Sequence, residues 1–162
     1  NNKNKEGIWK YYSDQGKLFL QESYKQNNKH GTFLQYTADG IVIEEVNWQM
    51  GVKHGNWKKF YVEGPKMWES TYVNGKLEGE AKSYFKNGVL QKQGNFKNDL
   101  MDGDWLKFSQ NGKLEKVYHY KNGVCPGLEK ENELMLEQME QNKGQIEDPA
   151  EHANDPEWFM RK

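Results

Sequence analysis

Glycine recurs every 24 residues along this chain, and this period constrains the fold more than any other feature. One series consists of Gly7, Gly31, Gly55, Gly79, Gly103 and Gly127. A second series begins nine residues later and consists of Gly16, Gly40, Gly64, Gly88 and Gly112. A fixed period of this size, kept over five copies without an insertion, predicts a solenoid-like repeat array rather than a closed globule.

Aromatic residues keep the same period in three columns. The columns are Trp9, Phe33, Trp57, Ala81 and Trp105, with one lapse; Tyr12, Tyr36, Phe60, Tyr84 and Phe108; and Tyr24, Trp48, Tyr72, Phe96 and Tyr120. The chain is 14% aromatic but only 35% hydrophobic, and a thin array stabilised by stacked rings suits that composition better than a compact globule does. We therefore expect Phe60→Ala to cost about 3–5 kcal/mol of stability if that ring is buried.

Each copy contains two turns and two short polar-apolar strands. Asn74-Gly75 represents the first turn and Asn87-Gly88 the second, and Asn-Gly pairs favour tight hairpins. A lone hairpin is marginally stable, so the copies should pair edge to edge into one antiparallel sheet of about ten strands. Neighbouring copies would then lie about 9–10 Å apart, which is two strand spacings.

The block from Trp48 to Gly64, Trp-Gln-Met-Gly-Val-Lys-His-Gly-Asn-Trp-Lys-Lys-Phe-Tyr-Val-Glu-Gly, resembles the MORN repeat in the variant common in bacterial proteins. The resemblance extends over about residues 4–127. It implies an all-β fold with a single elongated, curved antiparallel sheet, and a role as scaffold, dimerisation element or partner-binding surface. Departures concentrate in the fourth copy, where Ala81 replaces an aromatic residue and Asp99 replaces a turn glycine.

The periodicity stops after Gly127, which divides the chain into a repeat array over 1–127, with its first copy truncated at the start, and a tail over 128–162. Residues 129–162 carry ten acidic and four basic groups. Apolar residues at helical spacing predict a helix over about 128–142 that caps the last hairpin, followed by an extended acidic segment. We expect the terminal Trp158, Phe159 and Met160 to bind protein, either the chain's own sheet or a partner.

The sequence contains no pattern typical of an enzyme or a metal site. His30 and His54 share a column in adjacent copies, about 9–10 Å apart, which is far for two ligands of one ion. Both are interpreted as turn-packing residues, and Cys125 as an ordinary turn residue. We expect no catalytic, cofactor-binding or metal-binding residues. Lysines such as Lys58 and Lys59 look scattered along the sequence, so nucleic-acid binding is not expected.

Three functions remain open at this point. The first is a non-catalytic protein-interaction scaffold in a bacterial cell envelope, periplasmic or outer-membrane associated, with possible membrane attachment through an N-terminal lipid anchor upstream of Asn1. The second is a glycan-binding module that uses exposed aromatic columns. The third is a cytoplasmic, antitoxin-like protein that binds a partner, which is a label that many bacterial relatives carry.

Overall fold

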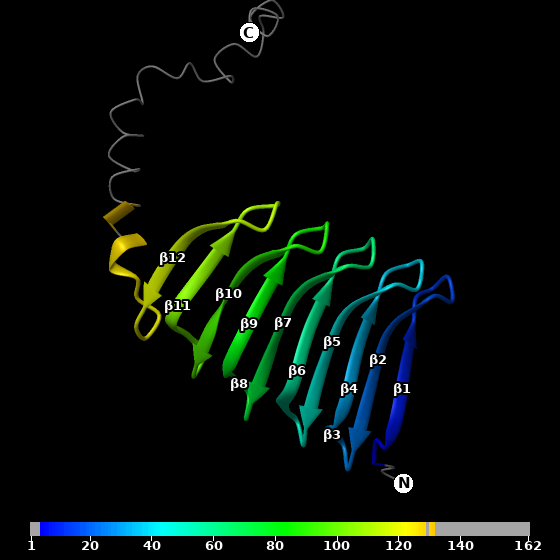
Figure 1. The fold of residues 1–162 in the computed structure, drawn as a ribbon. Coiled ribbons are helices and arrows are strands. Elements are labelled where there is room, and N and C mark those ends of the chain that lie inside the picture. The colour runs from blue at the N-terminus through cyan, green and yellow to red at the C-terminus, as the bar shows by residue number, and fades with distance from the viewer. Residues whose placement is uncertain (1–3, 129, 132–162) are drawn as a thin grey trace, which may run out of the picture. The chain divides into compact units, whose positions relative to one another are not determined.

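The computed structural model describes residues 4–128, 130 and 131 of the chain. These residues form one 12-stranded sheet, seen in Figure 1 as a single twisted layer. Its strands are β1 (Gly7–Tyr12), β2 (Leu18–Lys25), β3 (Asn28–Lys29), β4 (Gly31–Tyr36), β5 (Val42–Gln49), β6 (Val52–Phe60), β7 (Lys66–Val73), β8 (Lys76–Leu77), β9 (Gly79–Tyr84), β10 (Leu90–Lys97), β11 (Leu100–Phe108) and β12 (Leu114–Tyr120).

The sheet is an antiparallel meander in which each main strand pairs with the next main strand along the chain. Its main path runs β1-β2-β4-β5-β6-β7-β9-β10-β11-β12, and the two-residue strands β3 and β8 pair with β2 and β7. The prediction of an all-β sheet made from edge-paired hairpins is therefore confirmed, with ten strands on the main path. In β6 and β11 the segments equivalent to β3 and β8 are continuous with the strand that follows.

The tight turns adopt the backbone expected for Asn-Gly. Asn74 has φ 50° and Gly75 has φ 85°, and two successive positive φ values are typical of the type I′ hairpin turn. In the fourth copy Asp99 occupies the glycine position with φ 69°. Its Oδ1 accepts a hydrogen bond from the backbone N–H of Leu77 at 2.7 Å, which stabilises this departure from glycine.

Each tight turn is also hydrogen-bonded to a side chain 20 residues earlier. The backbone N–H of Asn74 donates to Nδ1 of His54 at 3.3 Å, and that of Asn98 donates to Oε2 of Glu78 at 2.8 Å. Glu6, His30 and Asp102 accept the equivalent bonds in the other copies. The column of varied residues that contains both histidines is thus a column of hydrogen-bond acceptors, which explains why His, Glu and Asp replace one another there.

The strand register places side chains on two chemically different faces. The aromatic face carries the ring columns that include Trp57, Trp105, Tyr72 and Phe96, because Trp57 pairs with Ser70 and Val46, and Phe96 with Gly79. The polar face carries the alternate positions, such as Lys58 opposite Glu69. The aromatic face therefore carries two of the three ring columns, whereas the third column lies with the charged residues of the polar face, where Tyr84 donates a hydrogen bond to Glu69.

The core lies within the aromatic face rather than between layers. Its buried apolar residues are Val46, Ala81, Trp105 and Cys125. Ala81, where the aromatic column lapses, is wholly inaccessible to solvent. Phe60 is half-buried, so its ring does not meet the condition on which the predicted 3–5 kcal/mol depended. A partly exposed ring loses less contact on truncation, and about 2 kcal/mol is the better expectation.

The sheet unit ends just after β12. A bridge joins Lys121 and Val124, and the described residues become helical from Pro126, two residues before the predicted start. Proline is favoured at the first position of a helix, because it has no N–H to leave unpaired there. Within the part of the chain that the structure describes, no helix is long and apolar enough to cross a membrane. The predicted extent of the helix, its capping of the last hairpin and the acidic segment lie outside the described residues.

Candidate interaction surface on the aromatic face

Rings contact one another directly in the C-terminal half of the aromatic face. The contacts run from Trp57 to Trp68, from Trp68 to Phe96 and from Phe96 to Trp105, with centroids 6.0, 6.2 and 5.1 Å apart. Trp105 continues the chain of contacts to Tyr120 at 6.4 Å. All four pairs meet edge to face, which is a favoured arrangement for aromatic rings.

Trp68 and Trp105 together fill the space that Ala81 leaves. Ala81 lies opposite Gly94, and a Cβ placed on Gly94 would lie only 2.2 Å from Trp105, so the indole ring rests directly on the glycine backbone. Trp105 Nε1 donates to the carbonyl of Asn95 at 3.1 Å, and Trp68 Nε1 donates to Ser70 Oγ at 3.0 Å. The lapse in the aromatic column is thus compensated by a tryptophan on either side.

In the N-terminal half, lysines lie over the aromatic rings. The ammonium of Lys5 lies 4.8 Å from the centroid of Trp9 and 4.7 Å from that of Tyr24. The ammonium of Lys53 lies within 6 Å of three rings, at 5.9 Å from Trp48, 5.8 Å from Trp57 and 4.9 Å from Tyr72. Lys29 lies above Phe33 and Trp48 in the same way. These are cation–π contacts repeated at the 24-residue period.

The first copy also contains a buried carboxylate. Glu22 is 6% exposed, accepts a hydrogen bond from Tyr24 Oη at 2.6 Å and forms an ion pair with Lys29 Nζ at 2.6 Å. Burial alone would raise the pKa of this carboxyl, but the hydrogen bonds from Lys29 and Tyr24 and the charge of Lys29 outweigh burial and lower the pKa. The hydrogen bond to Glu22 correspondingly raises the pKa of Tyr24.

A further row of lysines crosses the last strands of the aromatic face. Lys92 on β10 pairs with Lys107 on β11, which pairs with Lys116 on β12. Like charges directly opposite one another destabilise a sheet. Glu115 relieves part of this repulsion through an ion pair with Lys107 at 3.0 Å. From the sequence alone, the lysines are interpreted as scattered. The 24-residue period of Lys5, Lys29 and Lys53 was nevertheless a signal in the sequence for the column of lysines that lies over the rings.

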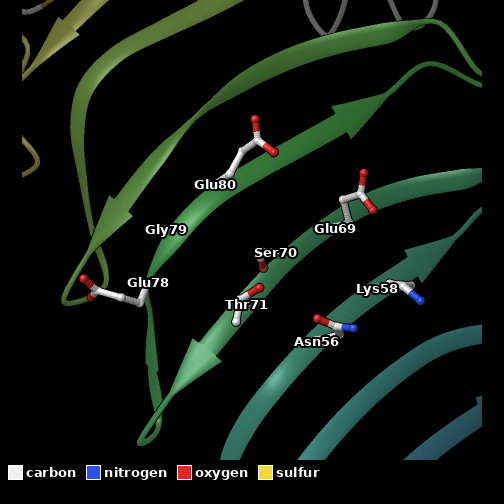
Figure 2. A pocket seen from close by; sticks show the side chains of 8 residues that line it. All are labelled: Asn56, Lys58, Glu69, Ser70, Thr71, Glu78, Gly79 and Glu80. Atoms are coloured by element: carbon white, nitrogen blue, oxygen red, sulfur yellow. The ribbon is translucent and has the colours of Figure 1, made fainter.

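The polar face carries a depression of about 340 Å³ between β6, β7 and β9 (Figure 2). The carboxylates that line it already have partners. Glu69 forms an ion pair with Lys66 at 2.7 Å, Glu80 forms one with Lys82 at 2.5 Å, and Glu78 accepts the turn N–H of Asn98. Each of these three carboxylates is thus held by a hydrogen bond or an ion pair within the sheet.

The positions considered for metal binding or reactivity have structural roles in the sheet. His30 and His54 accept turn N–H groups through Nδ1, as described above. Cys125 is buried at the end of the last turn. Among residues 4–128, 130 and 131, no group of three or more His, Cys, Asp or Glu side chains is placed to hold a metal ion. Trp158, Phe159 and Met160, predicted to bind protein, lie outside the described residues.

Comparison with known families agrees with this geometry. A family model for the MORN repeat variant matches residues 5–26, 29–50, 77–98 and 101–122, together more than half of the chain. The chain belongs to the MORN repeat variant family. Residues 53–74 lie between the matched MORN copies and form the same arrangement in β6 and β7. No curated protein matches the chain. MORN repeats take part in protein or membrane-lipid interactions.

Proposed function

We propose that the chain is a non-catalytic scaffold that binds a protein partner on its aromatic face. The observation that carries this proposal is the separation of the two faces of one layer. The rings and the lysines above them line one side across the main strands, and no second layer of described residues in the sheet unit covers that side. Aromatic residues such as Trp and Tyr are enriched at protein interfaces and contribute much of the binding energy there.

The glycan-binding alternative is less well supported by the same face. A sugar stacks on the open face of an aromatic ring, but ammonium groups lie 4.7–5.9 Å from the centroids of the rings in the N-terminal half. In the C-terminal half the rings pack against one another. An antitoxin-like role would also use a partner-binding face, and differs from our proposal in partner and compartment rather than in surface.

We place the proposed scaffold in the bacterial cell envelope, as expected from the sequence. Fractionation of the cells in which the protein occurs naturally, followed by immunoblotting of the endogenous protein, checks this location. Recovery in the cytoplasmic fraction alone would favour the antitoxin-like alternative.

Neighbouring lysines on β6 provide a matched test of the binding face. Lys58 points to the polar face and Lys59 to the aromatic face, since Lys58 pairs with Glu69 and Lys59 with Trp68. A photo-crosslinking amino acid at position 59 of the full chain should capture a discrete protein in cells, whereas the same group at position 58 should not. Equal capture from both positions, or capture from 58 alone, would contradict the proposal.

A further inference from the structure

The geometry points to an extended acidic segment of a partner protein as the ligand of the aromatic face, an inference that rests on the proposed function. Its first ground is a column of lysines held in place by rings. Lys5 and Lys53 lie over rings, and neither has an acidic partner among the described residues, whereas Lys29 pairs with Glu22. Two positioned cations without a counter-ion favour an anionic ligand.

The row that joins Lys92, Lys107 and Lys116 is an independent ground for the same inference. Lys92 and Lys107 stand directly opposite one another, and such a like-charge pair costs stability in the free protein. An anion that lies along this row would relieve the repulsion, so binding and stability are coupled there. In the corresponding central row of the polar face, lysines alternate with acids, as in Glu45, Lys58, Glu69 and Lys82 across β5, β6, β7 and β9.

The spacing of the lysines indicates the form of the ligand. Successive copies lie about 9–10 Å apart, and an extended peptide advances about 3.3 Å per residue. Carboxylates at every third residue of a peptide that crosses the strands would therefore match successive lysines of the column. The charge density of nucleic acid, about one phosphate per 1.7 Å of duplex, is much higher than that of this column. The whole chain has a pI of about 6.5, unlike a typical nucleic-acid-binding domain.

Binding of a synthetic peptide to the full chain tests the inference. The probe is a capped peptide of five Glu-Thr-Thr units, titrated at low salt and followed by calorimetry. A control peptide of the same composition has its glutamates in one block. We expect the spaced peptide to bind more tightly than the block peptide, and added salt to weaken its binding.

Two double variants of the full chain locate the binding site by face. Lys5→Gln with Lys53→Gln removes two cations from the aromatic face and should weaken binding about five- to tenfold. Lys10→Gln with Lys58→Gln removes two from the polar face and should change affinity less than about twofold. Circular dichroism confirms that both variants fold. Equal losses in the two variants, or no binding of the spaced peptide to the wild-type chain, would overturn the inference.

A single variant separates this binding role from a purely structural one. Lys92→Gln relieves like-charge repulsion, so it should raise the melting temperature by about 1–3 °C while weakening peptide binding. A lower melting temperature, or unchanged binding, would contradict a role of the row in binding. Vesicles containing phosphatidylserine and a 15-nucleotide oligothymidine are tested in parallel, and tighter lysine-dependent binding of either would overturn the choice of an acidic peptide. Crosslinking at position 59 together with failure of the peptide would leave the scaffold proposal standing and remove only this inference.

Discussion

The two halves of the sheet share one backbone plan but fill their aromatic face differently. In the N-terminal half, Lys5, Lys29 and Lys53 lie between the rings, and each ammonium lies above two or three of them. In the C-terminal half the same column continues as Leu77 and Met101, and the rings touch one another directly. The comparison teaches that the 24-residue frame fixes where side chains lie, while local residues decide whether cation–π contacts are added to ring–ring contacts, because Trp9 and Tyr24 also meet edge to face at 6.4 Å.

The largest expected difference between the halves comes from removing a ring of the first aromatic column. Trp105 is 3% exposed and packs on Gly94, so Trp105→Ala should cost about 3–5 kcal/mol. Trp9 is 41% exposed, so Trp9→Ala should cost only about 1–2 kcal/mol. Urea unfolding of both variants measures the difference. Equal losses would show that the halves depend on their rings to the same extent.

The second prediction concerns the buried carboxylate of the N-terminal half. Because the folded pKa of Glu22 is lowered, its contribution to stability is present above its unfolded pKa of about 4.3 and is lost as the pH falls through the folded value. Hydrogen exchange should therefore show β1 and β2 losing protection before β10 and β11 on acidification. Glu22→Gln should cost about 1–3 kcal/mol at pH 7, because it leaves Lys29 without its acidic partner, and should remove this early loss. Simultaneous loss in both halves of the wild type would contradict this account.

A third, smaller effect is expected at the turn acceptors, which are histidines in the middle of the array and acids at Glu78 and Asp102. His54→Leu removes the acceptor of the Asn74 N–H and should cost about 1 kcal/mol. His54→Glu, which copies the fourth repeat, should change stability by less than about 0.5 kcal/mol. Thermal unfolding compares the two variants. A loss as large for glutamate as for leucine would indicate that the imidazole ring, rather than its acceptor, stabilises the turn.

The smallest effect should come from converting the packing of one half into that of the other. Lys53→Met introduces the residue type that Met101 has at the equivalent position of the C-terminal half. The variant loses cation–π contacts but gains apolar contact with the same rings, so we expect a change below about 1 kcal/mol in urea unfolding. A loss above about 2 kcal/mol would mean that the ammonium itself is required, and that the two halves are not interchangeable.

Much of the fold could be predicted from the sequence because its determinants are local and repeated. Glycine and asparagine at fixed offsets specify the turns, and the aromatic columns specify which side chains share a face. The compensation at Ala81 could not be predicted, since it depends on Trp68, which belongs to no column. The acceptor role of His54 was also hidden, because its partner lies 20 residues away in the next turn and becomes visible only when the register is known.

The lysines of the aromatic face could not be identified from the sequence either. Lys53 and Lys59 are both on the aromatic face, whereas Lys58 is on the polar face. Adjacent lysines in the sequence thus belong to different surfaces, and a linear count mixes them. The bulges at the glycines also make it harder to predict from the sequence which face a side chain is on. Between Val46 and Trp48 the register shifts opposite Gly55, so simple alternation does not carry across that point.

The bonds that join each tight turn to the copy before it make the chain modular in length. The turn N–H of Gly75 donates to the carbonyl of Lys53, and that of Gly123 donates to Met101, always across one period. A duplication or deletion of 24 residues within the array would therefore leave every remaining turn with an adjacent partner. Lineages could lengthen or shorten such a sheet in steps of about 9–10 Å without redesigning any turn. The number of repeats, and with it the length of the aromatic face, can therefore change by gene duplication alone.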